Sequence, residues 1–217
     1  MITDIKIYGE RNSGTNFINL LLLHNFKNIN VLSPHHKHYS GWKHGYPNIN
    51  SFDKLKNILF IFIIRDLDPW IISMFKNPYH YKCPGTIEDF INNPLKICEP
   101  NKDHDVHINK EERKTIMDLR YSKIKSYLEM FNKIKNGIII NLENIQEDKG
   151  EKFIIFLHNK FNFEKVPKFI CINKHTKCKQ NILNRNYNAK IPECINDKIN
   201  KELELIVKEL KNNYLIK

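Results

Sequence analysis

The strongest constraint on the fold is the run ILFIFII at residues 58–64, which is apolar throughout. A half-exposed strand alternates apolar and polar residues, whereas an uninterrupted apolar run is typical of a parallel strand covered on both faces. Further strand patterns occur at 4–9, 29–34 and 137–142, with helical patterns between them. This alternation predicts an α/β fold of three layers around a central parallel sheet.

The spacing of apolar residues predicts several helices and one more strand. We expect helices at 14–27, around 51–57, at 68–77 (with Asp68 as N-cap), 86–93, about 113–135, 150–161 and roughly 196–213, and an edge strand at 168–173. Two of these helices have a clear apolar stripe, namely Met117, Tyr121, Ile124, Leu128 and Phe131 in one, and Ile199, Leu203, Ile206 and Leu210 in the other. Without a repeat or a linker, residues 1–217 are expected to form a single domain.

Composition narrows the class of protein. The five cysteines form no CxxC pair, which favours free thiols in a reducing compartment. No apolar run reaches eighteen residues and no leader pattern opens the chain, so we expect a cytoplasmic protein without a membrane span. The net charge of +11 fits a solvated lysine-rich surface, or an anionic ligand such as a nucleotide, a sulfated or phosphorylated substrate, or nucleic acid.

The first strand pattern ends in the loop GERNSGTN at residues 9–16, which leads directly into an apolar helix. Its glycines have the spacing of the nucleotide-binding loop GxxxxGK[ST], in which loop amides and the helix N-terminus bind phosphate, although glycines also serve such turns sterically. Thr15 stands at the lysine position of that motif and Asn16 at the magnesium-ligand position. Because phosphoryl transfer depends on that lysine and on Mg²⁺, the loop favours a phosphosulfate donor, whose transferred group carries less charge.

A second element follows about fifty residues later. Arg65 ends the apolar strand and Ser73 lies eight residues on, in the next helix. Ligands of open parallel sheets bind beyond the carboxyl ends of the strands, so both residues are expected to face one crevice. Together with RNSGTN after the first strand, this arrangement resembles the sulfotransferase family, which uses 3′-phosphoadenosine 5′-phosphosulfate (PAPS). The stretches WKHGYP (42–47) and GIIINLENIQEDKGEKFIIFLHNKF (137–161) resemble further parts of that family.

The resemblance implies a P-loop-like fold and in-line transfer of a sulfuryl group from PAPS to a hydroxyl or amine, without a metal. The acceptor would be a carbohydrate, a small molecule or a protein, and the nucleotide product 3′-phosphoadenosine 5′-phosphate (PAP). His44 is the expected general base, and Lys43 or Arg11 is expected to stabilise charge on the leaving oxygen. The residues expected to bind the nucleotide are Arg11, Asn12, Ser13, Gly14, Thr15, Asn16, Arg65 and Ser73.

The sequence departs from the family pattern at three places. The family has Lys or Arg directly before Ser-Gly-Thr, whereas this chain has Asn12 there and Arg11 one residue earlier. Lys43 and His44 are adjacent, where the cytosolic enzymes have Lys-x-His, which leaves the identity of the base open. Their late Arg-Lys-Gly segment, a second 3′-phosphate contact, has no clean match here, and the basic stretch 173–186 is its candidate replacement.

Two residues of the expected nucleotide site have a structural alternative. The alternative role for Arg65 is a structural ion pair with Asp66 or Asp68. The alternative for Ser73 is a hydrogen bond from its hydroxyl to a preceding carbonyl of the helix.

Other polar and aromatic residues also have two interpretations. Glu143 is an alternative base, with helix capping favoured. Trp70 and Tyr79 are expected to pack, with stacking on adenine as the alternative. The group His35, His36 and His38 is expected to be a polar loop rather than a metal site.

Two other functional classes compete with sulfuryl transfer. A P-loop nucleotide or small-molecule kinase would need a lysine in the first loop and a carboxylate for Mg²⁺. A basic nucleic-acid-binding protein would fit the net charge, but no recognition motif or RNP-like aromatic pattern is present, so nucleic acid is not the expected partner.

Overall fold

The structure is a computed structural model that describes residues 1–32, 41–47, 55–79, 81–82, 85–95, 115–172, 199–210 and 214–216. The strands within this part are β1 (Asp4–Gly9), β2 (Asn30–Val31), β3 (Ile58–Ile64), β4 (Gly137–Asn141) and β5 (Leu215–Ile216). The helices are α1 (Thr15–Asn25), α2 (Leu67–Lys76), α3 (Ile87–Asn92), α4 (Ile116–Lys133), α5 (Leu142–Glu147), α6 (Glu151–Phe161) and α7 (Lys201–Glu209).

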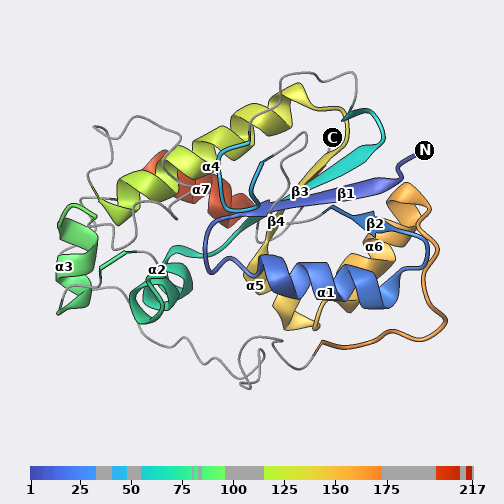
Figure 1. Ribbon diagram of the computed structural model, residues 1–217, viewed down its shortest axis with the longest axis horizontal. Helices are drawn as coiled ribbons and strands as arrows, with labels where there is room; N and C mark the ends of the chain where they lie inside the picture. Colours follow the sequence, from blue (N-terminus) through green and yellow to red (C-terminus); the bar gives the residue numbers. More distant parts are fainter. Residues whose placement is uncertain are drawn as a thin grey trace.

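The strands form one sheet in the order β2-β1-β3-β4-β5. The first four strands are parallel, and the short β5 pairs antiparallel with β4. β3 lies at the centre, pairs along its whole length and is fully buried, as its apolar sequence predicts. The fold is therefore α/β with a mostly parallel sheet (Figure 1).

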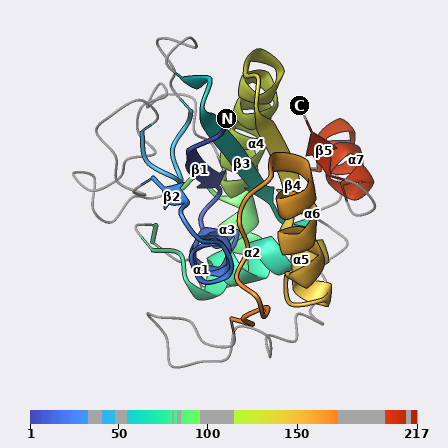
Figure 2. The same ribbon diagram turned by 90° about the vertical axis from the view of Figure 1, so that its right-hand side faces the viewer.

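Helices cover both faces of the sheet (Figures 1 and 2). Helices α1, α5 and α6 pack on one face, where Ile5, Ile61 and Ile140 contribute to the core. Helices α4 and α7 pack on the other face, against side chains such as Phe62 and Ile139. A third cluster joins α2 and α3 to the start of α4 beyond the carboxyl ends of the strands. This arrangement places the loops that follow β1 and β3 beside α2.

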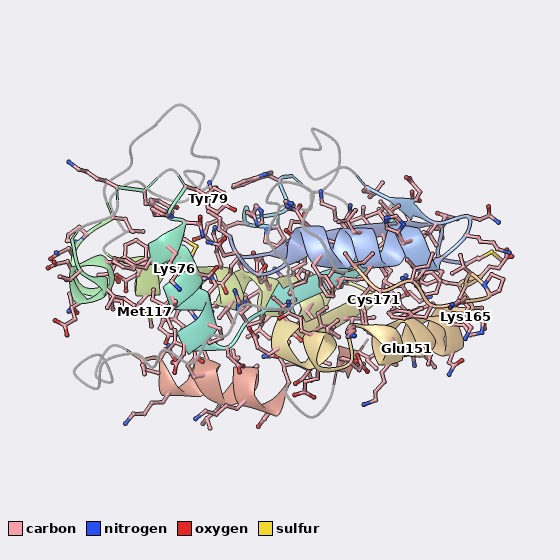
Figure 3. All side chains as sticks on the ribbon, turned by 90° about the horizontal axis from the view of Figure 1, so that it is seen from below. Lys76, Tyr79, Met117, Glu151, Lys165 and Cys171 are labelled. Atoms are coloured by element: carbon pink, nitrogen blue, oxygen red, sulfur yellow. The ribbon has the colours of Figure 1, made fainter. Side chains whose placement is uncertain are left out.

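The predicted strand at 168–173 is wrong over the residues described, 168–172, which form no strand. This stretch passes between α1 and α6, where Figure 3 labels Cys171. The Asn25 side chain takes the place of a neighbouring strand: its Nδ2 donates to Ile170 O at 2.9 Å, and its Oδ1 accepts from Ile170 N at 2.7 Å. One amide side chain thus satisfies both backbone groups of Ile170, so the segment needs no strand partner there.

Two helix predictions need correction in detail. In α7, Val207 and Glu204 are buried and Ile206 is not, because Glu204 turns inward to pair with Arg120 of α4. The N-cap of α2 is Asp66 rather than Asp68, and the Asp66 carboxylate accepts from Asn141 instead of capping the helix.

The remaining differences concern elements that the sequence patterns did not reveal. Helix α5 and strand β5 were not predicted. Of the expected helix at 51–57, only 55–57 are described.

None of the described helices is both long and apolar enough to cross a bilayer.

Candidate functional site

The loop after β1 turns tightly into α1. Ser13 N donates to Glu10 O at 3.1 Å, and Gly14 has a left-handed φ of 84°. The left-handed φ favours glycine at position 14, and a Cβ there would also lie 2.6 Å from Leu142 Cδ1. Helix α1 begins at Thr15 without a side-chain cap. The first amides of α1 therefore have no acceptor within the helix, and they carry the positive end of its dipole.

Asn12 is the point where the three predicted parts of the site meet. Its carbonyl accepts from Arg65 Nη1 at 2.9 Å, which ties the loop to the end of β3. Its side-chain Nδ2 lies 3.2 Å from Ser73 O and 3.2 Å from Asn77 O, which ties the loop to the end of α2. The structure thus brings the first loop, Arg65 and Ser73 together, with the Asn12 amide used as the link between them.

Arg65 is buried, with 3% of its side chain exposed, and has an ion-pair partner that the sequence did not predict. Its Nε donates to Glu143 Oε1 at 2.9 Å, and Glu143 Oε2 accepts from Asp66 N at 3.0 Å. The expected capping role of Glu143 is wrong, because Asn141 caps α5 by accepting from Asn144 N at 3.1 Å. Glu143 instead fixes the start of α5 to the end of β3.

Two buried serine hydroxyls in this region lack a described hydrogen-bond partner. Ser13 and Ser73 are 0% and 2% exposed, and their Oγ atoms have no hydrogen-bond partner within the described part of the chain. The Ser13 hydroxyl folds over Gly9, where a Cβ would overlap it. A buried hydroxyl without a partner costs about 1–3 kcal/mol, so each of these groups calls for an acceptor or donor from outside the described chain.

The segment 41–47 lies along the first loop. Gly9 N donates to Lys43 O at 2.9 Å, and Lys123 Nζ of α4 donates to His44 O at 2.7 Å. The Lys43 side chain reaches Asn16 Oδ1 in the first turn of α1. The structure therefore places Lys43 and His44 beside the loop.

The imidazole of His44 has a defined tautomer. Its Nδ1 lies 2.8 Å from Gly9 O, and since a carbonyl only accepts, Nδ1 carries the proton. Burial and the positive charge of Lys43 lower the pKa of His44 to about 3. The ring is therefore neutral near pH 7, and Nε2 has a lone pair that can accept a proton.

The guanidinium of Arg11 is held by aromatic rings. Its Cζ lies 4.6 Å from the centre of the Trp42 ring and 5.6 Å from that of Tyr79. Trp70 is buried, as expected for packing, and its Nε1 donates to Arg11 O at 3.1 Å. Tyr79, just after α2 (Figure 3), is 61% exposed, so the expected packing is wrong for this residue apart from its contact with Arg11.

Sequence reasoning missed a buried charge network behind the loop. Arg120 of α4 donates to Glu10 Oε2 at 2.9 Å and to Glu204 Oε1 at 3.2 Å, and all three side chains are buried. Arg120 Nη2 also donates to Arg65 O at 2.9 Å. Burial raises the pKa of Glu10 to about 7, with a further contribution from Glu204 and opposition from Arg120 and Lys123. No local pattern signals contacts between residues so far apart in the chain.

Further positive charge lies beside the segment 41–47. Lys6 in β1 is fully buried and donates from Nζ to Gly41 O at 2.9 Å. Burial and the charge of Lys43 lower the pKa of Lys6 to about 8. Because the positive charges of Lys6 and Lys43 repel each other, an anion bound beside them would be stabilised. The histidines His35, His36 and His38 and the stretch 173–186 lie outside the described residues.

Comparisons of this chain with models of protein families, with curated proteins and with solved structures gave no match. The case for a function therefore depends on the residues themselves.

Proposed function

We propose that this chain is a sulfotransferase that moves a sulfuryl group from PAPS to a hydroxyl or amine of an acceptor. The observation that carries the proposal is the meeting of the first loop, Arg65 and Ser73 at Asn12, with two buried hydroxyls, of Ser13 and Ser73, that lack a described partner. A nucleotide with a phosphate at each end of its ribose would supply both hydroxyls with an acceptor.

The 5′-phosphosulfate would lie at the start of α1. The amides of Gly14, Thr15 and Asn16 would donate to its oxygens, and Lys43, which contacts Asn16, would supply the positive charge that the loop itself lacks. Ser13 would contribute its hydroxyl. This is why Thr15 and Asn16 can replace the lysine and the magnesium ligand of a kinase loop.

The 3′-phosphate would lie between Arg65 and Ser73. Arg65 is held in place by Glu143 and by the carbonyl of Asn12, so its guanidinium is fixed before the ligand binds. A charged donor that is already positioned loses little entropy on binding a phosphate. The Ser73 hydroxyl would add a neutral donor on the α2 side of the same phosphate.

His44 would act as general base. The acceptor oxygen or nitrogen forms a bond to sulfur while its proton moves to His44 Nε2, and the bond between sulfur and the bridging oxygen breaks. Its electron pair stays on the 5′-phosphate of PAP, where Arg11 or Lys43 stabilises the new charge. The pKa of His44 is low in the free protein. The negative charge of the bound donor would raise the pKa of His44 toward the range useful for a base.

Thermal unfolding tests the proposal. PAP at a hundred times its Kd should stabilise the protein by about 2.7 kcal/mol, in EDTA as well as in Mg²⁺, and AMP and ATP at the same concentration should stabilise it less. The selectivity for PAP should disappear in Arg65→Ala. A strict requirement for Mg²⁺ with ATP would favour a P-loop kinase. Salt-dependent RNA binding that PAP does not affect would favour a nucleic-acid-binding protein.

A further inference from the structure

The side chain of Asn12 connects the loop after β1 to the carboxyl-terminal end of α2. Its Nδ2 lies 3.2 Å from Ser73 O, 3.2 Å from Asn77 O and 3.1 Å from Met74 Sδ. An amide nitrogen has two N–H groups, so the two carbonyl oxygens are enough to use both. The donors of the Asn12 side chain therefore face α2, where they hold the turn of helix that contains Ser73.

The backbone of Asn12 is held from the opposite side. Its carbonyl accepts from Arg65 Nη1 at 2.9 Å. Its φ is 60°, in the left-handed region, and Gly14 two residues later has a φ of 84°. Between them, Ser13 N closes the turn onto Glu10 O at 3.1 Å. Residues 12–14 thus form a tight turn that contacts the end of β3 through its backbone and α2 through one side chain.

The contacts of Asn12 lead to both of the serines that we assign to the nucleotide. The Ser73 carbonyl is shared by two donors, since Asn77 N lies 3.0 Å away at the C-cap of α2 and Asn12 Nδ2 lies 3.2 Å away. Ser13 directly follows Asn12 in the turn. The hydroxyls of both serines are buried and lack a described partner. A single amide therefore lies between the group assigned to the 5′-phosphate and the group assigned to the 3′-phosphate.

From these contacts we infer that Asn12 is a positioning residue that couples the two phosphate sites, so that a phosphate in one site raises the affinity of the other. The inference rests on the proposed sulfotransferase function. A phosphate at the start of α1 orders the loop, and the Asn12 amide extends that order to Ser73. The second phosphate then binds at a site whose freedom is already lost, and it pays less entropy. Linkage requires the reverse effect to be equally large.

The test uses a variant that removes the amide and keeps the turn. Asn12→Gly does so, because glycine adopts a φ of 60° without strain. Asn28→Gly is the matched control, since Asn28 has a φ of 54° and lies just beyond the other end of α1. We would measure the Kd for PAP, for AMP and for 3′-AMP by calorimetry. These ligands have both phosphates, the 5′-phosphate alone and the 3′-phosphate alone.

The expected result separates coupling from a general loss of structure. In Asn12→Gly the affinity for PAP should fall at least about fivefold, the low end of typical coupling, while each mononucleotide stays within about twofold of wild type. A merely structural role would weaken one or both mononucleotides as well. Asn28→Gly should bind all three nucleotides as the wild type does.

A second variant covers the case in which Asn12→Gly does not fold. Asn12→Asp keeps the shape of the side chain and tolerates a left-handed φ, but an ionised carboxylate cannot donate to the two carbonyl oxygens. Its negative charge should weaken both mononucleotides. The factor by which it weakens PAP should exceed the product of the two factors for AMP and 3′-AMP, because the coupling is lost in addition.

A resonance of α2 reports the coupling directly. The Asn77 amide donates to Ser73 O, so saturating AMP, which has no 3′-phosphate, should shift this resonance in the wild type and much less in Asn12→Gly. If PAP binds but Asn12→Gly weakens PAP no more than the mononucleotides, or leaves the Asn77 shift unchanged, the coupling role is wrong and the sulfotransferase proposal stands. If the wild-type protein binds no PAP, both are wrong.

Discussion

The replacement of Glu10 by Gln tests the buried charge network behind the loop. Glu10 directly follows β1, is 1% exposed and shares Arg120 with Glu204. Its pKa is raised to about 7 from the ordinary value of 4.5, mainly by burial. Between these two values the folded protein holds a proton that the unfolded chain releases. The free energy of unfolding must therefore fall as pH rises through this window.

The size of the effect follows from the two pKa values. At 1.36 kcal/mol for each pH unit between 4.5 and about 7, the carboxyl group of Glu10 removes about 3 kcal/mol of stability by pH 8 relative to pH 4. Glutamine does not titrate, so position 10 of the variant should contribute no fall in the free energy of unfolding across this pH range. The difference in unfolding free energy, variant minus wild type, should rise by about 3 kcal/mol across the window, whatever its value at pH 4.

Urea unfolding at half-unit pH intervals from 4 to 8.5 measures this difference, with linear extrapolation to water. Taking the difference cancels the titration of all other groups, including His44, whose effect has the opposite sign. Glu129→Gln, on the exposed side of α4, controls for the loss of one negative charge. Parallel curves for wild type and Glu10→Gln would refute the reasoning, because Glu10 would then titrate alike in the folded and unfolded chains.

Three further perturbations have definite expected outcomes. Gly14→Ala should destabilise the protein by about 2–3 kcal/mol in urea, from left-handed strain and overlap with Leu142, and the same substitution should cost less in a Leu142→Ala background than in the wild type. Asn25→Ala should cost about 1–3 kcal/mol by leaving the backbone groups of Ile170 unsatisfied, and hydrogen exchange at the Ile170 amide should quicken; an unchanged exchange rate would contradict this. The free energy of unfolding should fall less in His44→Gln than in the wild type as pH drops from about 6.5 toward 3, because His44 is protonated more readily in the unfolded chain than in the folded protein. The same pH profile in the variant and the wild type would contradict this.

The parts of the fold that sequence predicted are those set by local periodicity. β1 and β3 have the predicted bounds, because their patterns are strong and end at Gly9 and Arg65. The same patterns, with the rule that parallel strands present their carboxyl ends at one edge, were enough to bring Arg65 and Ser73 to the first loop. A prediction of this kind requires only that the order of elements be right.

The parts that sequence did not predict depend on contacts between distant residues. The Asn25 side chain hydrogen-bonds the backbone of Ile170, as a neighbouring strand would, and Arg120 pairs with Glu10 and Glu204. Neither contact leaves a pattern among residues that are neighbours in the sequence. The Arg11 contacts with Trp42 and Tyr79 were missed for the same reason. Around α7, Ile199, Leu203 and Leu210 of the predicted stripe pack on the core, but Glu204 is also buried because it pairs with Arg120, which the pattern does not indicate.

The most direct measurement titrates PAP and AMP by calorimetry into wild type, Ser13→Ala and Ser73→Ala. The account predicts that wild type binds PAP more tightly than AMP, that Ser13→Ala weakens both nucleotides, and that Ser73→Ala weakens PAP alone, since only PAP has a phosphate at the 3′ position. Equal affinity of the wild type for the two nucleotides, or an equal effect of Ser73→Ala on both, would contradict the claim that one nucleotide spans the two hydroxyls.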